Sequence, residues 1–227
     1  TWDELNAAAE KLQAAGIIPF AHGGQAWQDA TVFEAVAMGL GGNNYYKNCY
    51  VDLKESCLRS ETTVKVFDQM RKLQSYTDEG SPGRDWNVAT GMVIEGKAGF
   101  QIMGDWAKGE FTAAGKVPGV DYYCAATPSN NGYLYNVDSF IFYKSSDPDK
   151  QAGQKLLAKL MMGKNFQKVF NLYKGSIPAR LDVSMDEFDK CAKTSNADIK
   201  TAGAKGGLVP SFAHGMAQGN TMKAALQ

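Results

Sequence analysis

Four residues lie where predicted strands or helices end, and their side chains together could recognise a neutral sugar. They are Trp106 after "MGD", Asp138 within "NVDSF", Lys174 before "GSIPAR" and His214 within "FAHG". An aromatic ring can stack on the apolar face of a sugar ring, and Asp, Lys and His can make charge-assisted hydrogen bonds to sugar hydroxyls. The set therefore predicts binding of a hexose without its conversion, although each residue alone is more typical of packing or capping.

An enzymatic alternative rests on carboxylates. Asp105 and Asp138, with Glu110 nearby in sequence, could supply the acid pair that glycoside hydrolysis requires. The distance between the two carboxyl groups decides that chemistry, and the sequence does not fix it. Ser139 lacks the GxSxG pattern of a serine hydrolase. A binding protein that is not an enzyme is therefore the preferred hypothesis, and a sugar-active glycosidase is the alternative.

Metal and nucleotide sites are disfavoured. The two histidines, His22 and His214, lie far apart in sequence, and neither has His or Cys at the spacing of metal ligands. The segment "GLGGNN" follows a predicted helix, whereas a phosphate-binding loop follows a strand and carries Lys before Ser or Thr. We expect neither a metal nor a cofactor.

The composition of the chain excludes some classes of binding partner. The chain has 227 residues, 44% of them apolar, which is enough for one large core or two small ones. Lys plus Arg equals Asp plus Glu at 24 each, so the charge excess typical of nucleic-acid or anionic-membrane binders is missing. We therefore expect a ligand that is uncharged or charged only locally, and no nucleic acid.

Alternating strands and helices must position the candidate residues. Apolar spacing and capping residues predict helices over 2–15, 29–38, from Ser60 through "MRKLQ", 86–94, 148–162 and 165–173. Strands are predicted at "IIPF", "GFQIMG", "VDYYC" and "LYNVDSFIFYK", with an Asn- and Tyr-rich loop over 41–48. This order predicts an α/β fold with its ligand at the strand ends.

Five segments resemble a known family along nearly the whole chain and in the family's order. They are "TWDELNAAAEKLQAAGIIPFAHGGQAWQ", "GFQIMGDWAKGEF", "NVDSF", "VFNLYKGSIPARLD" and "VPSFAHGMA". They resemble the glucose- and mannose-binding solute receptors of bacterial ATP-driven (ABC) sugar transporters, and are most similar to the periplasmic glucose-binding proteins of the Pseudomonas kind.

The resemblance implies a two-lobed, type II periplasmic-binding-protein fold with the ligand in the interlobe cleft. It places 1–128 and 180–227 in the C-terminal lobe, and 129–179 as a crossover strand and helices of the other lobe. The front of that lobe and the end of the C-terminus are expected to be missing from this sequence. The implied protein is a periplasmic monomer that binds glucose, with galactose or mannose as alternatives, and delivers it to a membrane permease.

The same resemblance assigns roles. Trp106 matches the tryptophan that stacks on the sugar, Asp138 the acceptor and Lys174 the donor for sugar hydroxyls, and His214 the site histidine. Trp27 and His22 are interpreted as core and loop packing.

The four cysteines contain no CxxC pair, and their even count suits two disulfides or four thiols equally. An oxidising periplasm favours disulfides. With the resemblance, the favoured pairs are Cys124–Cys191 and Cys49–Cys57.

Overall fold

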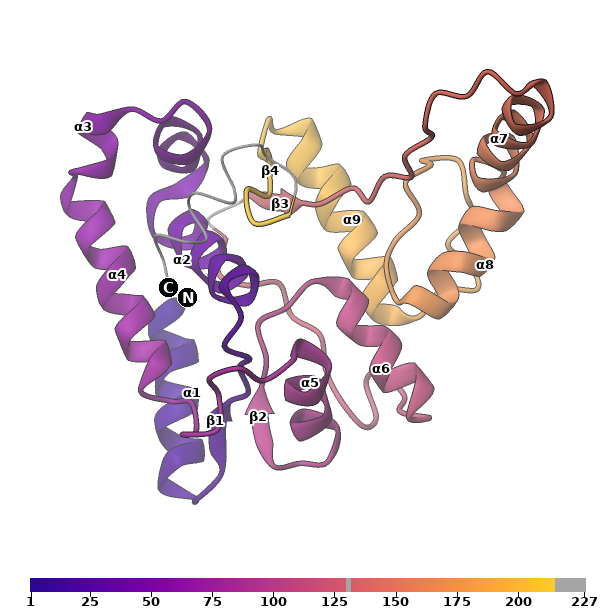
Figure 1. Ribbon diagram of the computed structural model, residues 1–227. Helices are drawn as coiled ribbons and strands as arrows, with labels where there is room; N and C mark the ends of the chain where they lie inside the picture. Colours follow the sequence, from indigo (N-terminus) through magenta and orange to yellow (C-terminus); the bar gives the residue numbers. More distant parts are fainter. Residues whose placement is uncertain (130–131, 215–227) are drawn as a thin grey trace.

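Two pairs of short parallel strands join segments that are far apart in the chain. In the computed structural model, which describes residues 1–129 and 132–214, β1 (Ile18–Phe20) pairs with β2 (Ala98–Phe100). The second pair is β3 (Tyr133–Tyr135) with β4 (Leu208–Pro210). Both pairs are parallel, and helices lie between the paired strands along the chain (Figure 1). The predicted α/β class is confirmed.

Helices make up most of the described chain. The predicted helix over 2–15 is confirmed as α1, which starts with a capping box in which the Thr1 hydroxyl accepts from the Glu4 amide. The helical elements are α1 (Trp2–Ala14), α2 (Ala26–Tyr46), η1 (Lys47–Val51), α3 (Glu55–Leu58), α4 (Glu61–Gln74), α5 (Trp86–Ile94), η2 (Asp105–Ala107), α6 (Lys108–Ala113), α7 (Pro148–Met161), α8 (Lys164–Lys174) and α9 (Lys190–Ala204).

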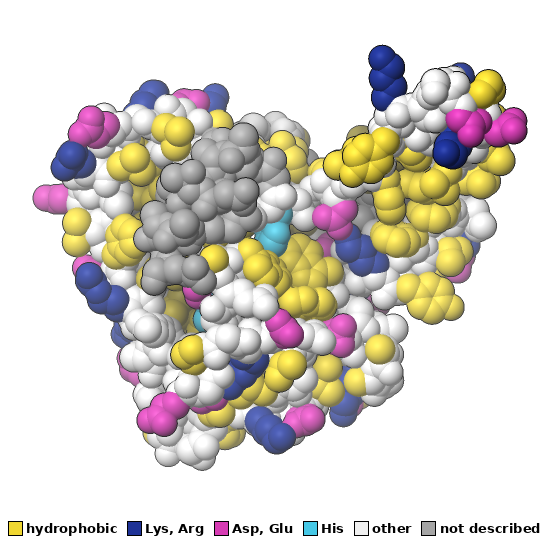
Figure 2. Space-filling view, in the orientation of Figure 1, with side chains coloured by type: hydrophobic (Ala, Val, Ile, Leu, Met, Phe, Trp, Pro, Cys, Tyr) yellow, Lys and Arg dark blue, Asp and Glu magenta, His cyan; other side chains and the backbone are white. Residues whose placement is uncertain are grey.

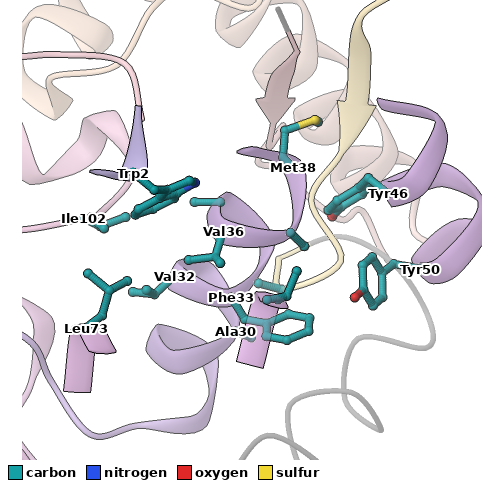
Figure 3. Packing of buried hydrophobic residues seen from close by; sticks show 14 of the residues in the cluster. Trp2, Ala30, Val32, Phe33, Val36, Met38, Tyr46, Tyr50, Leu73 and Ile102 are labelled. Atoms are coloured by element: carbon teal, nitrogen blue, oxygen red, sulfur yellow. The ribbon is translucent and has the colours of Figure 1, made fainter. Parts of the chain in front are cut away.

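Helix α2 is the centre of the hydrophobic core. Phe33 on this helix packs against Tyr50 and Phe212, which come from η1 and from the segment after β4. Side chains from α1 and α4, among them Trp2 and Leu73, close the core from another side (Figure 3). Burial of each such side chain stabilises the fold by about 1.5–3 kcal/mol. The α2 helix is thus a rigid support for the segment after β4, which carries His214.

The predicted loop over 41–48 is wrong. Helix α2 continues through a kink at Gly42 (φ 72°) to Tyr46, and a π-helical turn follows. Tyr46 and Tyr50 are fully buried in the core. Their burial outweighs the weak helix propensity of the Gly and Asn residues.

Three strand predictions also differ from the structure. The run "GFQIMG" is a strand only as far as Phe100. The run "VDYYC" forms only an isolated bridge between Pro118 and Tyr122, and the Tyr122 ring stacks on Phe111 instead. The run "LYNVDSFIFYK" is a strand only as far as Tyr135. Beyond it, 136–144 has no partner strand among the described residues, so its backbone forms no ladder.

Both predicted disulfides are present. Cys49–Cys57 closes a short loop between η1 and α3. Cys124–Cys191 spans 67 residues and joins the segment after α6 to the first turn of α9. The second bridge therefore fastens the middle of the chain to its last described helix.

Helices α7 and α8 form an arm that projects to one side of the molecule, with the end of α8 against α6 (Figure 1). The chain enters this arm through 136–147 and leaves it through 175–189. Large apolar side chains on the arm are exposed to solvent, namely Leu156, Leu157, Leu160, Met162, Val169, Phe170 and Tyr173. We call α7 and α8 the arm and the remaining described elements the body. The predicted assignment of 129–179 to a second lobe remains a prediction.

Candidate functional site

A cavity of about 620 Å³ lies where the arm meets the body, and all four residues predicted from the sequence line it. Figure 2 shows a hollow at this place, with hydrophobic, histidine, acidic and basic side chains around it. The lining consists of three indoles together with polar and glycine residues: Trp27, Trp86, Trp106, Gly109, Glu110, Asn136, Asp138, Tyr173, Lys174 and His214. The fold thus brings together side chains that are up to 187 positions apart in the sequence, from Trp27 to His214.

Trp106 lies in η2, just beyond the strand β2. Its indole folds back over Gly104, where a Cβ atom would lie 2.1 Å from the ring. Only glycine at 104 leaves room for this orientation. The Trp106 and His214 rings meet edge to face, with centroids 5.1 Å apart and an interplanar angle of 77°.

His214 is held between two tryptophans and a hydroxyl group. Its ring also meets Trp27 edge to face at 5.6 Å, and its Nε2 lies 2.9 Å from Thr31 Oγ1. The Thr31 hydroxyl donates its single hydrogen to the Trp27 carbonyl at 2.8 Å. It can therefore only accept from the ring, which places a proton on His214 Nε2.

Asp138 and Lys174 form an ion pair across the cavity wall. The second carboxylate oxygen of Asp138 accepts from the side-chain amide of Asn136 at 3.1 Å. The hydrogen bond from Lys174 lowers the pKa of the Asp138 carboxyl below its usual value. The pair therefore presents an ionised acceptor and a cationic donor next to the indoles.

A close approach of two backbones fixes Lys174. Helix α8 ends at Lys174, and Gly175 follows in the left-handed conformation with φ 90°. A Cβ atom on Gly175 would lie 2.7 Å from the Gly109 amide nitrogen, and one on Gly109 would lie 2.9 Å from the Lys174 carbonyl oxygen. These two glycines allow α6 and α8 to touch, and so bring the lysine to the cavity.

Asp105, one of the two carboxylates of the glycosidase hypothesis, is not among the residues that line the cavity. Its oxygens accept from Ser176 Oγ at 2.8 Å and from the Ile177 amide at 3.3 Å. Burial raises the pKa of Asp105. The structure thus gives Asp105 the role of fastening the segment after α8 to η2, and the proposed pair with Asp138 gains no support.

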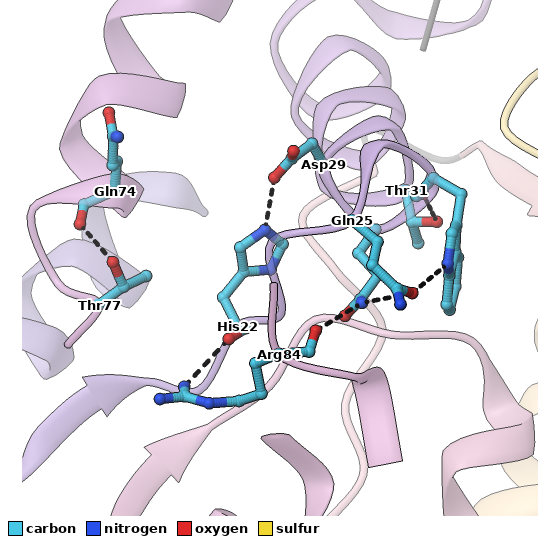
Figure 4. Close-up of polar contacts among 9 residues, drawn as sticks. His22, Gln25, Asp29, Thr31, Gln74, Thr77 and Arg84 are labelled. Carbon is cyan, nitrogen blue, oxygen red and sulfur yellow. Dashed lines mark hydrogen bonds and ion pairs between the residues drawn. The ribbon is translucent and has the colours of Figure 1, made fainter. Parts of the chain in front are cut away.

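Trp27 and Trp86 also line the cavity, and sequence reasoning did not place them there. Trp27, interpreted as packing, lines the cavity as well, and Gln25 Oε1 accepts from its indole nitrogen at 2.8 Å. His22 is not among the lining residues, and its Nε2 pairs with Asp29 at 2.7 Å (Figure 4).

One signal links the three cavity tryptophans. Trp27, Trp86 and Trp106 all occupy the first or second residue of a helix after a glycine-containing turn. A helix start alone is not enough, because Trp2 also begins a helix, without a preceding glycine, and is buried in the core, 5% exposed.

The arrangement suits a small uncharged ring. Indoles offer flat apolar surfaces, while the Asp138–Lys174 pair, Glu110 and Asn136 offer hydrogen bonds at the rim. Within 1–129 and 132–214, no group of three or more His, Cys, Asp or Glu could hold a metal ion. No helix among those residues is long and apolar enough to cross a membrane.

Named relatives match almost the whole chain. It is 48% identical over 226 residues to a probable sugar-binding periplasmic protein of Brucella suis, covering 99% of this chain and 53% of that protein. A protein of the same description from Rhizobium meliloti is 47% identical over 227 residues, covering all of this chain and 54% of that protein. The chain spans about half the length of these relatives. Their names confirm the predicted periplasmic location.

Solved structures confirm the fold. The bacterial solute receptor AcbH, described as having an exclusive preference for β-D-galactopyranose, superposes with a TM-score of 0.61 at 18% identity over 100% of this chain and 57% of that one. A chitin oligosaccharide binding protein gives 0.67 at 17% identity, over 93% of this chain and 54% of that one. At these identities the likeness concerns the fold, which is the type II periplasmic-binding-protein fold.

The family is shown by a match over most of the chain. The sequence profile of the bacterial extracellular solute-binding proteins matches residues 1–161. That range includes β1, β2, the three cavity tryptophans and Asp138. The chain belongs to the bacterial extracellular solute-binding protein family.

Proposed function

We propose that the protein binds a sugar in the cavity and delivers it to an ABC transporter of the cytoplasmic membrane, without converting it chemically. The observation that carries the proposal is the convergence of three indoles, the Asp138–Lys174 pair and His214 on one cavity. The sugar-binding names of the relatives support the ligand class.

Each side chain has a role in this proposal. Trp106 stacks on one face of the sugar ring, and Trp27 and Trp86 supply further apolar wall. Asp138 accepts from sugar hydroxyls and Lys174 donates to them. Asp138 and Lys174 already pair with each other, so each charge has a partner before the sugar binds. When the sugar binds, its hydroxyls replace part of the hydrogen bonding within this pair, and neither charge is left unpaired.

The proposed ligand is a monosaccharide, with glucose first and galactose or mannose as alternatives. The cavity volume of about 620 Å³ is within the range of small-molecule sites. Glucose itself rests on the resemblance of the segments around Trp106, Asp138 and Lys174 to glucose-binding receptors. We further propose that the receptor acts as a monomer with the permease as its partner.

Residues 129–179 belong, in this proposal, to the second lobe of a two-lobed receptor. Two observations support it: the chain spans about half of its relatives, and the arm exposes apolar side chains that a larger lobe would cover. The cavity then lies between lobes, and closure on the sugar follows from contacts to both.

Titration of the full-length protein with glucose, galactose and mannose, followed by tryptophan fluorescence and calorimetry, tests the proposal. We expect saturable binding of at least one sugar and weaker binding by Trp106→Ala. Trp2→Phe is the matched control, because it removes an indole from the core and leaves the cavity intact. Absence of binding by the parent for all three sugars would contradict the proposal.

A second assay separates binding from catalysis. Incubation with labelled oligosaccharides should release no product if the protein is a receptor. Product that disappears in Asp138→Asn would instead favour a glycosidase.

A further inference from the structure

A buried carboxyl group lies beneath the segment that carries His214. Glu34, on α2, is only 3% exposed. It accepts hydrogen bonds from Ser211 Oγ at 2.7 Å, from the Phe212 and Ala213 amides at 3.1 and 3.4 Å, and from the Tyr46 hydroxyl at 3.1 Å. One side chain thus gathers three donors from three consecutive residues of the segment 211–214.

Further hydrogen bonds complete the attachment of this segment. The Ser211 hydroxyl accepts from the His214 amide at 3.2 Å, and the Tyr46 hydroxyl lies 3.1 Å from the Pro210 carbonyl oxygen. Most of the polar contacts of the turn therefore meet at Glu34 or at its partner Tyr46, and the Ser211 amide adds one to the Tyr135 carbonyl at 2.9 Å. A buried carboxyl is costly unless it is hydrogen-bonded, and here four donors compensate it, whereas an apolar side chain would leave those donors without an acceptor. What the carboxyl adds is one defined conformation of the turn.

The His214 ring also contacts α2, the helix that carries Glu34. Thr31 accepts from the ring nitrogen, and it precedes Glu34 by three residues, which puts both side chains on one face of α2. Glu34 fixes the backbone of the turn and Thr31 fixes the ring. The ring then meets Trp106 and Trp27 edge to face inside the cavity.

We propose that Glu34 is a positioning residue for ligand binding, which sets the place of His214 between the two indoles through the turn 211–214. This inference rests on the proposed function, because it assigns His214 to the same cavity. Glu34 is not itself among the residues that line the cavity.

The test compares Glu34→Ala and Glu34→Gln with a matched control in the full-length protein. Asn6→Ala is the control: Asn6 is also buried and makes a reciprocal pair of hydrogen bonds, with Gln69 at 2.9 and 3.0 Å, between α1 and α4. Three quantities are measured: the melting temperature, the NMR signals of the His214 ring and the affinity for glucose. The His214 signals are assigned by their loss in His214→Asn.

We expect Glu34→Ala to shift the His214 ring signals and to weaken glucose binding by about fivefold to tenfold, the effect of one misplaced hydrogen-bonding group. Glu34→Gln keeps the shape and one acceptor oxygen, so it should recover part of both. Asn6→Ala should lower the melting temperature and change neither of the other readouts.

A folded Glu34→Ala protein with parental His214 signals and parental glucose affinity would overturn the inference. If Glu34→Ala does not fold, Glu34→Gln decides by the same two readouts. If the parent binds no sugar, the proposed function fails, and the His214 signals alone still decide whether Glu34 positions the ring.

Discussion

Replacing Glu34 by glutamine should remove a pH dependence of stability that the parent protein shows between about pH 4.5 and pH 7. Burial raises the pKa of Glu34 to about 7 from its ordinary 4.5, although hydrogen bonds from Ser211, Ala213, Tyr46 and Phe212 act in the opposite direction. Glutamine has nearly the same shape and does not titrate.

The sign follows from proton binding. Between the two pKa values the folded state keeps a proton on Glu34 that the unfolded chain has released, so a rise in pH favours unfolding. The contribution of this group is complete below about pH 4.5 and is lost as the pH rises through about 7. Each pKa unit corresponds to about 1.4 kcal/mol, so the whole effect on the free energy of unfolding is on the order of 3 kcal/mol.

The neighbouring titratable groups do not hide this effect. Tyr46 contacts the carboxyl, and Tyr50 packs against Tyr46. Burial raises the pKa of both phenols above the usual value, so both stay neutral across the range. Because Glu34→Gln also affects the placement of His214, the comparison is repeated in the His214→Asn background. The difference between the two proteins there isolates Glu34.

Urea unfolding of both proteins, followed by circular dichroism at several pH values between about 4.5 and 8, measures that difference. The parent should lose stability relative to Glu34→Gln as the pH rises. Parallel stability profiles for the two proteins would refute the reasoning.

Three further predictions concern other contacts. Replacing Cys124 and Cys191 together by alanine should lower the free energy of unfolding by about 4 kcal/mol, which is the chain-entropy value for a loop of this length. An unchanged midpoint of urea unfolding would contradict this prediction. Gly104→Ala should displace the Trp106 indole, whose ring lies 2.1 Å from the new Cβ position, and so weaken glucose binding while far-UV circular dichroism stays parental. Lys174→Met should weaken glucose binding about tenfold by removing a charge-assisted donor, and calorimetry showing equal affinity would contradict it.

The four cavity residues that were predicted from the sequence lie at features visible in short stretches of the chain. Trp106, Lys174 and His214 each follow a strand or helix pattern that stops, and Asp138 is an acidic residue inside a strand-like run. Both features are visible within a few residues. Trp27 reaches the cavity only because the segment after β4 packs over α2, a contact across more than 180 positions. The place of Trp27 at a helix start is visible locally, but its contact with His214 is not.

The errors in the predicted secondary structure also come from contacts, or missing contacts, between distant parts of the chain. Residues 41–48 have turn-like composition, yet burial of Tyr46 and Tyr50 keeps them helical. Residues 136–144 have strand-like composition, yet a strand requires a partner, and the described residues supply none beyond Tyr135. The structure confirms the helices predicted over 2–15, 86–94 and 148–162, because the backbone hydrogen bonds of a helix join residues that are close in sequence.

The ion pair of Asp138 with Lys174 has a mechanical consequence. Asp138 lies on the connection that enters the arm, and Lys174 is the last residue of the helix before the connection that leaves it. The pair therefore ties the incoming connection to the end of the arm, while Asp105 anchors the outgoing connection to the body through Ser176 and Ile177. A rotation of the arm that moves Lys174 relative to Asp138 changes the separation of the ammonium and carboxylate groups. It thereby changes the charge pattern inside the cavity.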